Sequence, residues 1–250
     1  MASLLNYPLV VFALSFVVLS ASVGTGARFA DRAEAVRDDL SVVLAATLTL
    51  LGLIVGFTFS MAVSRYDQRK LYEEEEANAI GTEYLRSDLV PASDGETIRK
   101  LLRDYLDQRI VFYETRDQDA LRRSGVSTAQ LQTDLWTAVT RATASAQTPV
   151  TALAVSGMND VLNSQGYSQA AWLNRIPVAA WGLLAVIAVC ANVMLGLSWH
   201  RGRAMGLLLG ILPAMVSAAV LLIADIDAPR GGLIHVRAVN LIDLAASLRP

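Results

Sequence analysis

The sequence predicts an all-α membrane protein with four transmembrane helices and a helical soluble insert between the second and the third. Charged residues make up only 18% of the 250 residues, whereas soluble domains carry about 25%. The mean hydropathy is +0.42. Four stretches of more than 20 residues contain no charged residue. About 20 apolar residues are enough for a helix to cross the hydrocarbon core of a bilayer.

We expect the spans near Leu5–Val23, Leu40–Val63, Pro177–Leu197 and Ala204–Ala224. They should be helices, because backbone amides inside a bilayer must bond within their own segment. The first span could instead be a signal peptide, since Ser20, Ala21 and Ser22 are small residues of the kind found at a cleavage site. No Lys or Arg precedes it, however, and signal peptides begin with basic residues. We therefore favour a retained helix, with two hairpins at residues 1–64 and 176–224.

Residues 65–175 form the predicted insert, because they hold 29 of the 44 charged residues. Residues 40–89 contain no proline, so the second span should continue into the insert as one helix, about 75 Å long at 1.5 Å per residue. Apolar residues at helical spacing predict further helices from about residues 96, 128 and 150. No alternating strand pattern is present. Residues 225–250 are predicted to be a tail that packs on the insert or lies at the membrane interface.

Several classes of function are excluded by composition. The net charge of −2 argues against binding to nucleic acid, which requires a basic footprint. One cysteine and two histidines leave no basis for a disulfide framework or a metal cluster. No zinc-protease, serine-hydrolase or phosphate-loop motif occurs. We therefore expect no catalytic residue, no metal and no cofactor, and we predict that the protein is not an enzyme.

The orientation in the membrane is set mainly by Lys and Arg close to the spans. The two short loops hold five of these residues and the opposite side holds six, which is nearly balanced. The first span has no basic residue before it and three after it. We therefore expect a protein of the cell (inner) membrane with the short loops in the cytoplasm and the insert outside.

Small residues at GxxxG spacing occur in two spans. This spacing lets helix backbones approach closely in lipid. It predicts either packing of the four helices within one chain or an interface between subunits of a homo-oligomer. The residues concerned are Gly52 and Gly56 in the second span and Gly202, Gly206 and Gly210 around the start of the fourth.

The second span is the most polar of the four. Thr47 and Thr58 could line a pore and Phe57 could gate it by excluding water. Alternatively, threonine hydroxyls bond back to carbonyls of their own helix and have no role in transport. Asn192 in the third span is a further pore candidate, although an interhelical hydrogen bond explains it better.

Two acidic groups stand close to the membrane boundaries. Residues 73–76 are four consecutive glutamates, which spread around a helix and cannot converge on one ion. We interpret them as a solvated face, with an acidic ring around a pore mouth as the alternative. Asp225, Asp227 and Arg230 follow the fourth span. They are candidates for a pore mouth, or they form a turn in which carboxylates bind Arg230 or backbone amides.

Three segments resemble the bestrophin-like family of bacterial and plant membrane proteins. They are residues 51–67, residues 76–85 with Glu76-Ala77-Asn78, and residues 224–232 with Asp227-Ala228-Pro229-Arg230-Gly231-Gly232. The resemblance covers most of the chain, including its two hairpins. It implies likeness to bestrophins, which are oligomeric anion channels. The acidic calcium-clasp run of animal bestrophins is missing, and residues 73–76 do not replace it.

Two hypotheses about function follow. The first is an oligomeric membrane protein that passes inorganic ions, with membrane lipid around it and the second span lining the pore. The second is a non-conducting sensor or scaffold whose insert binds a partner. An intramembrane enzyme would need a polar catalytic set that the spans lack.

Overall fold

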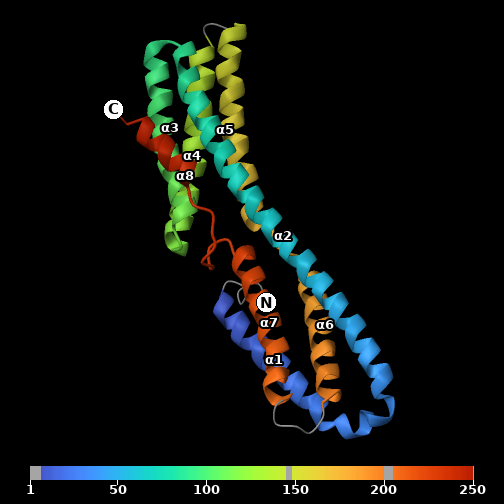
Figure 1. Ribbon diagram of the computed structural model, residues 1–250. Coiled ribbons are helices and arrows are strands. Elements are labelled where there is room, and N and C mark those ends of the chain that lie inside the picture. Colours follow the sequence, from blue (N-terminus) through green and yellow to red (C-terminus); the bar gives the residue numbers. More distant parts are fainter. Residues whose placement is uncertain (1–6, 145–147, 200–204, 250) are drawn as a thin grey trace. The chain divides into compact units, whose positions relative to one another are not determined.

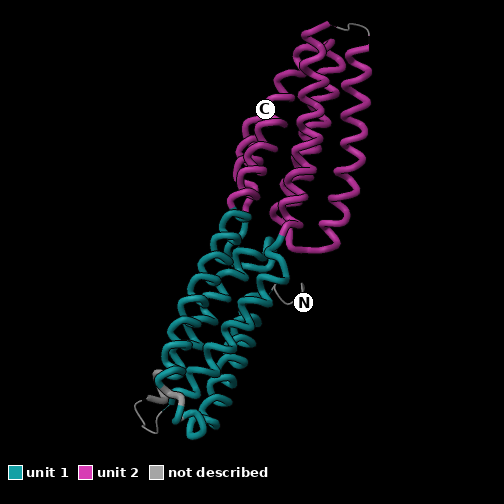
Figure 2. Tube along the Cα trace, turned by 90° about the vertical axis from the view of Figure 1, so that its right-hand side faces the viewer, with its two compact units in different colours: residues 1–66, 175–235 teal, residues 67–174, 236–250 magenta. Residues whose placement is uncertain are grey.

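The computed structural model describes residues 7–144, 148–199 and 205–249, which are helical over most of their length and contain no strand. Four of the helices are long and apolar enough to cross a membrane, so the predicted fold class is confirmed. The chain divides into two compact units (Figure 2). Unit 1 comprises residues 1–66 and 175–235, and unit 2 comprises residues 67–174 and 236–250.

Unit 1 is built from apolar helices (Figure 1). They are α1 (Pro8–Arg28), the first half of α2 (Arg37–Arg86), α6 (Val178–Leu197) and α7 (Met205–Asp227), with the short 3₁₀ helix η2 (Ala30–Val36) between α1 and α2. Helix α1 packs against α6 and α7. The internal core includes Leu19, Leu51, Leu184 and Val216, one from each of the four helices.

The backbones of α1 and α6 approach each other closely at two glycines. A Cβ atom at Gly26 would lie 2.0 Å from the carbonyl oxygen of Val193, and one at Gly196 would lie 2.1 Å from that of Val23. Only glycine allows two backbones to come this close, and lipid-embedded helices use such contacts because lipid gives them no hydrophobic drive to associate. The pair therefore fixes how α1 and α6 pack.

Unit 2 is a helical bundle. It contains the second half of α2, η3 (Ser87–Leu89), α3 (Ala92–Glu114), α4 (Gln118–Thr143), α5 (Pro149–Leu173) and α8 (Val239–Ser247). Asp117 caps α4 by accepting from the amide of Asp119, and Thr148 forms a capping box with Thr151 at the start of α5. Helix α3 packs against both α4 and α8.

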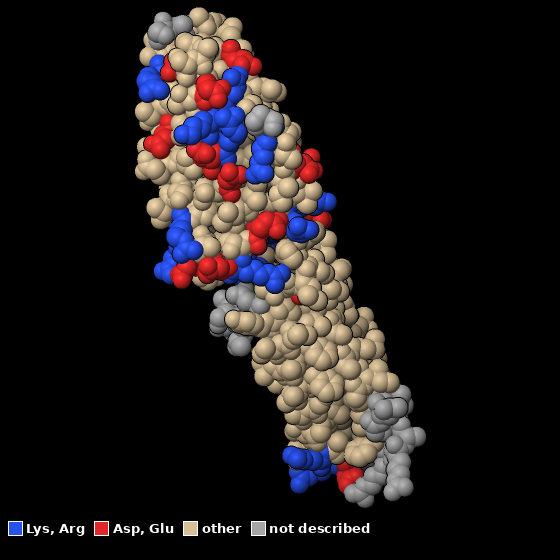
Figure 3. Space-filling view, turned by 90° about the vertical axis from the view of Figure 1, so that its left-hand side faces the viewer, with Lys and Arg blue, Asp and Glu red and all other residues tan. Residues whose placement is uncertain are grey.

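Helices α3 and α5 begin near the expected positions, and the continuous helix that begins in the second span is confirmed and has 50 residues. The expected start near residue 128 is wrong, because α4 begins at Gln118 with Asp117 as its cap. The end of the chain packs on the insert, since Leu241 of α8 is fully buried in unit 2. Figure 3 shows charged side chains crowded over the helices of unit 2 and a largely uncharged surface over the apolar helices.

Candidate functional site

The membrane half of α2 is the least covered of the four spans. Only 6% of its most apolar window is buried, compared with 22–33% in the other three. Leu51 and Thr58 lie seven residues apart on the one buried face of this half. Since seven residues complete two helical turns, they form a single narrow stripe of contact. The other faces of α2 remain open within the chain.

Two different stripes run along those open faces. One consists of small side chains at helical spacing and contains Ala45, Thr49, Gly52, Gly56 and Ser60. The other consists of large apolar side chains and contains Val43, Leu50, Leu53 and Phe57. Phe57 is 58% exposed. One open face of α2 therefore consists of small side chains that allow close helix contact, and the other consists of large apolar side chains that include the ring of Phe57.

The predicted threonine sites differ from one another. The Thr47 hydroxyl donates to Val43 O at 2.8 Å, and the Thr58 hydroxyl donates to Ile54 O at 2.7 Å. Both therefore bond back to their own helix, which is the simpler alternative. Thr58 is also buried against the chain itself. Within the single chain Thr58 therefore faces the neighbouring helices, whereas Thr47 is partly accessible.

Asn192 is fully buried in α6, so it does not face a conduction path. Its side-chain amide donates to Ala188 O at 2.7 Å, one turn earlier in the same helix. The expected interhelical bond is therefore replaced by an intrahelical one. The pore candidate at this position is corrected accordingly.

The predicted packing glycines face open space where the structure describes them. A Cβ atom at Gly52, Gly56 or Gly210 would meet no atom within 4 Å, so none of the three joins two helices of one chain. Gly202 lies outside the described residues, and Gly206 lies in the first turn of α7. The close contact at Gly26 and Gly196 was missed, although the Ser22-x-x-x-Gly26 spacing is a small-residue signal.

Asp225 organises the loop that follows α7. Its Oδ1 accepts from the amide of Leu233 and its Oδ2 accepts from the amide of Ile234, both at 2.8 Å. A Cβ atom at Gly232 would lie 2.5 Å from the backbone oxygen of Asp225, so only glycine fits there. These contacts explain the acidic, glycine-rich sequence as a folded turn.

Asp227 ties the end of α7 to the start of α6. Its Oδ1 accepts from the amide of Ile176 at 3.1 Å, and the residue is almost completely buried. Arg230 is half-buried in the same loop. Both carboxylates thus bind backbone amides, but the amide that Asp227 binds belongs to Ile176 and not to the turn. Asp225 and Asp227 are both buried within the single chain, so their place at a pore mouth stays a prediction.

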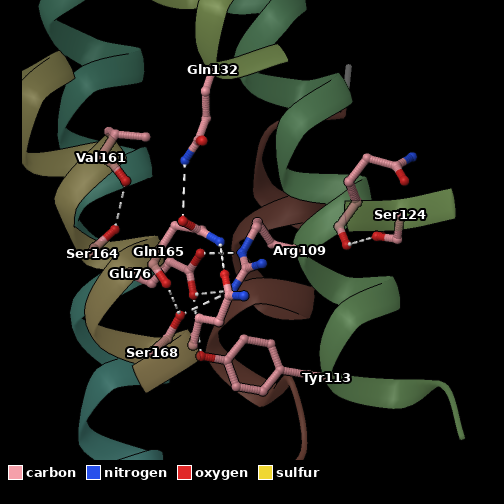
Figure 4. A network of polar contacts seen from close by, with 11 residues as sticks. Glu76, Arg109, Tyr113, Ser124, Gln132, Val161, Ser164, Gln165 and Ser168 are labelled. Atoms are coloured by element: carbon pink, nitrogen blue, oxygen red, sulfur yellow. Dashed lines mark hydrogen bonds and ion pairs between the residues drawn. The ribbon is translucent and has the colours of Figure 1, made fainter. Parts of the chain in front are cut away.

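Glu76 and Arg109 form a buried ion pair at the centre of unit 2 (Figure 4). Arg109 also donates to the hydroxyl of Ser168 at 3.0 Å, and its guanidinium lies 4.4 Å from the ring centroid of Phe112. The hydroxyl of Tyr113 donates to Glu76 Oε2 at 3.2 Å. The network joins α2, α3 and α5.

Burial and neighbouring charge both shift the pKa values of Arg109 and Tyr113. Burial lowers the pKa of Arg109, but the Glu76 carboxylate more than offsets this and raises the pKa above its ordinary value. Burial, and then Glu76, raise the pKa of Tyr113. The network therefore keeps Arg109 protonated and the phenol of Tyr113 neutral in the interior of unit 2.

Glu73 anchors the end of the chain. It accepts from the amide of Leu241 at 3.0 Å and from the side-chain amide of Asn240 at 2.6 Å. Glu73 and Glu76 are both buried, whereas Glu74 and Glu75 are exposed. The prediction of a solvated face for residues 73–76 is wrong for the two buried members, because each meets a specific partner.

Glu83 lies about two helical turns after Glu76 on α2 and is completely buried. Neither carboxylate oxygen has a hydrogen-bond partner in the described part of the chain. Gly157 of α5 provides the space for this carboxylate, since a Cβ atom there would lie 2.1 Å from Glu83 Oε2. Burial, opposed by Arg86 and assisted by Asp160, raises the pKa of Glu83 to about 8. No sequence pattern distinguished this residue from the other acids of the insert.

This all-α arrangement, with four apolar helices and a charged bundle, defines a class of polytopic membrane protein. The sequence model of the bestrophin-like domain matches residues 8–241. The chain therefore belongs to the bestrophin-like family. No curated protein matches it.

Solved structures agree with this fold. A tryptophan-to-alanine mutant of a bacterial bestrophin homologue from Klebsiella pneumoniae matches with a TM-score of 0.67 and 12% identity, over 95% of this chain and 93% of that one. A tyrosine-to-alanine mutant of the same homologue has a TM-score of 0.68 and 12% identity, over 94% and 96%. A membrane protein with a proline-to-alanine change has a TM-score of 0.62 and 13% identity, over 95% and 97%. At such identities the likeness concerns the fold alone.

Proposed function

We propose that this chain is one subunit of a homo-oligomeric membrane protein that lets inorganic ions pass, with α2 lining the path. The observation that carries the proposal is the open membrane half of α2, which has one small-residue face and one apolar face. Copies that contact each other through the small face would turn the apolar face, with Phe57, toward a common axis. A ring of apolar side chains can gate by excluding water.

Membership of the bestrophin-like family supports this proposal, because the resemblance implies an anion channel. The exposed side chains revise the candidate set. Phe57 and Thr47 remain as gate and wall candidates. Asp225, Asp227 and Arg230 belong to the folded loop that follows α7. We therefore expect their influence on the ion path to be indirect.

The proposal is tested by reconstituting the purified protein in planar bilayers and recording currents in asymmetric KCl. We expect discrete steps, and their reversal potential gives the preferred ion. Phe57→Ala should raise the open fraction or the conductance. Phe16→Ala is the matched control, because Phe16 is an exposed aromatic residue on α1. Equal effects of the two changes would exclude Phe57 as a gate.

Subunit contact through α2 is tested separately by cross-linking. Gly52→Cys in a Cys190→Ser background should join differently tagged copies through a bifunctional thiol reagent. Val186→Cys on the exposed face of α6 is the comparison. Cross-linking at Val186 but not at Gly52 would place the interface elsewhere.

The scaffold remains a second candidate because the insert exposes large apolar side chains. Leu85, Val126 and Leu173 are each more than two-thirds exposed. Protein that is folded and silent across voltage and pH would favour this candidate over conduction.

We also propose an inner-membrane location with the insert outside the cytoplasm, from the basic loop residues. Glu75→Cys in the Cys190→Ser background should react with an impermeant thiol reagent added to intact cells. Protection until the cells are opened would reverse this orientation.

A further inference from the structure

An apolar trough runs along the surface of unit 1 between α1, α6 and α7. Its volume is about 370 Å³, which is within the range of small-molecule sites. Side chains of Val, Leu, Ile and Ala make up most of the wall, and the ring of Trp181 forms part of it. Leu14, Val18, Leu184 and Val220 represent the three helices.

The position of the trough corresponds to one leaflet of a bilayer. On α6 it extends from Val178 to Val189, about 17 Å at 1.5 Å per residue. The hydrocarbon core is about 30 Å thick, so one leaflet accounts for about 15 Å. On α1 the lining extends from Val11 to Leu19, near the start of that helix. All three helices thus border the trough in the leaflet where α1 begins and α7 ends.

Polarity changes sharply along the trough. Among the described residues of the lining, the one hydroxyl belongs to Ser15, and it bonds back to Val11 O at 2.8 Å and Phe12 O at 3.0 Å. The one charged side chain in this described lining is Arg175, which is half-buried just before α6 begins. An occupant that matches this wall has an apolar chain and one anionic end.

Arg175 already has a contact within the chain, so a phosphate would be a further partner of its guanidinium. Asp227 is the nearby acid, and its Oδ1 accepts from the amide of Ile176. Asp225 is taken up by two amides of its own loop. A guanidinium has five N–H donors, which can serve protein contacts and a phosphate together, and arginine binds phosphate in a bidentate way. Basic pockets between spans bind anionic headgroups on this principle.

We propose that an anionic phospholipid occupies this trough, with one acyl chain along α1, α6 and α7 and its phosphate on Arg175. The site is independent of ion conduction, because it lies on helices other than the open face of α2. A lipid held there would fill the gap between α1 and α6 and stabilise their packing.

Quenching of Trp181 fluorescence by brominated lipids tests this site. The other three tryptophans are changed to phenylalanine, and the full chain is placed in nanodiscs containing phosphatidylglycerol or phosphatidylcholine brominated in mid-chain. We expect phosphatidylglycerol to quench Trp181 at several-fold lower mole fraction than phosphatidylcholine does. Arg175→Gln should abolish this preference, whereas Arg175→Lys should retain part of it.

A plugged variant tests the trough itself. Ala185 lines the trough and Val186, the next residue on α6, faces away from it. Ala185→Phe should reduce quenching by both lipids, and Val186→Phe should leave it unchanged, provided that both keep the parent's circular dichroism. Equal quenching by the two lipids, insensitive to Arg175→Gln and Ala185→Phe, would overturn the proposal. Quenching by neither lipid, with cross-links between copies at Ala185→Cys, would assign the trough to a second copy. The test does not depend on current, so its failure and that of the proposed conduction are distinguishable.

Discussion

The two units are both helical, but unit 1 exposes large apolar side chains and unit 2 buries ionisable ones. Unit 1 exposes large apolar side chains such as Leu9, Leu53 and Phe57, because lipid is as apolar as they are. Unit 2 buries two arginines and three glutamates of α2 and α3 (Arg69, Glu73, Glu76, Glu83 and Arg109). Lipid-embedded helices are thus fixed by close backbone contact, and the helices of the insert by specific buried charge.

The largest expected effect comes from breaking the buried ion pair of unit 2. Glu76→Ala leaves Arg109 charged and unpaired in the interior, and such a change costs about 3–5 kcal/mol. Urea unfolding can be followed through Trp172, which packs on Phe112 and Tyr113, in a chain with its other tryptophans changed to phenylalanine.

The control for this change is Glu75→Ala, an exposed neighbour that should cost almost nothing. Replacing both partners, Glu76→Met with Arg109→Met, should recover most of the loss, since no lone charge then remains. A loss in Glu76→Ala no larger than that in Glu75→Ala would show that the pair does not hold the bundle.

The next largest effect concerns the glycine contact of unit 1. Gly196→Ala forces the backbones of α1 and α6 apart, because the new methyl group would meet Val23 O at 2.1 Å. Overpacking of this kind costs about 1–3 kcal/mol. Unfolding followed through Trp181 measures it. Gly24→Ala on α1, where a Cβ atom would meet no atom within 4 Å, should be neutral or stabilising because alanine favours helices. Equal losses in the two variants would contradict the contact.

A smaller, local effect is expected at the loop after α7. Asp225→Asn places an amide N–H where a carboxylate oxygen accepts from the backbone, which costs about 1–2 kcal/mol. Hydrogen exchange at the amides of Leu233 and Ile234 should become faster. Asp243→Asn on the exposed face of α8 should not change it. Unchanged exchange in Asp225→Asn would show that the Asp225 carboxylate does not hold these two amides.

The last effect is a pH dependence. Because burial raises the pKa of Glu83 to about 8, the folded chain holds this proton over a range in which the unfolded chain has lost it. Stability should therefore fall as pH rises from about 4.5 to 8 and then level off. Glu83→Gln should flatten this slope, because glutamine has no proton to lose, and its stability relative to the parent should increase as pH rises toward 8. Glu74→Gln, which is exposed, should follow the parent; a parent without the slope would contradict the shift.

Hydropathy and charge were sufficient to predict the spans and the insert, because these properties depend on composition over about 20 residues. The sequence also indicated that α2 continues through the boundary of the membrane, because no proline interrupts residues 40–89. These features are local to one helix, and each helix forms with little help from its neighbours.

The polar positions were harder to predict because their role depends on partners distant in sequence. Glu76 meets Arg109 and Glu73 meets Leu241, and neither partner has a fixed spacing. Thr58 and Phe57 are adjacent in sequence, yet one is buried and the other exposed. Periodicity alone does not tell which face of α2 meets the rest of the chain.

The contact of Gly26 with α6 has a consequence for biosynthesis. The ribosome completes α6 only after about 170 further residues, which takes roughly 10–30 s at 5–20 residues per second. During that time the newly inserted α1 has no α6 to pack against, and its exposed glycine face is available to insertion machinery, to lipid or to neighbouring nascent chains. The speed of translation, and not the final stability of the contact, sets the minimum lifetime of this unassembled helix.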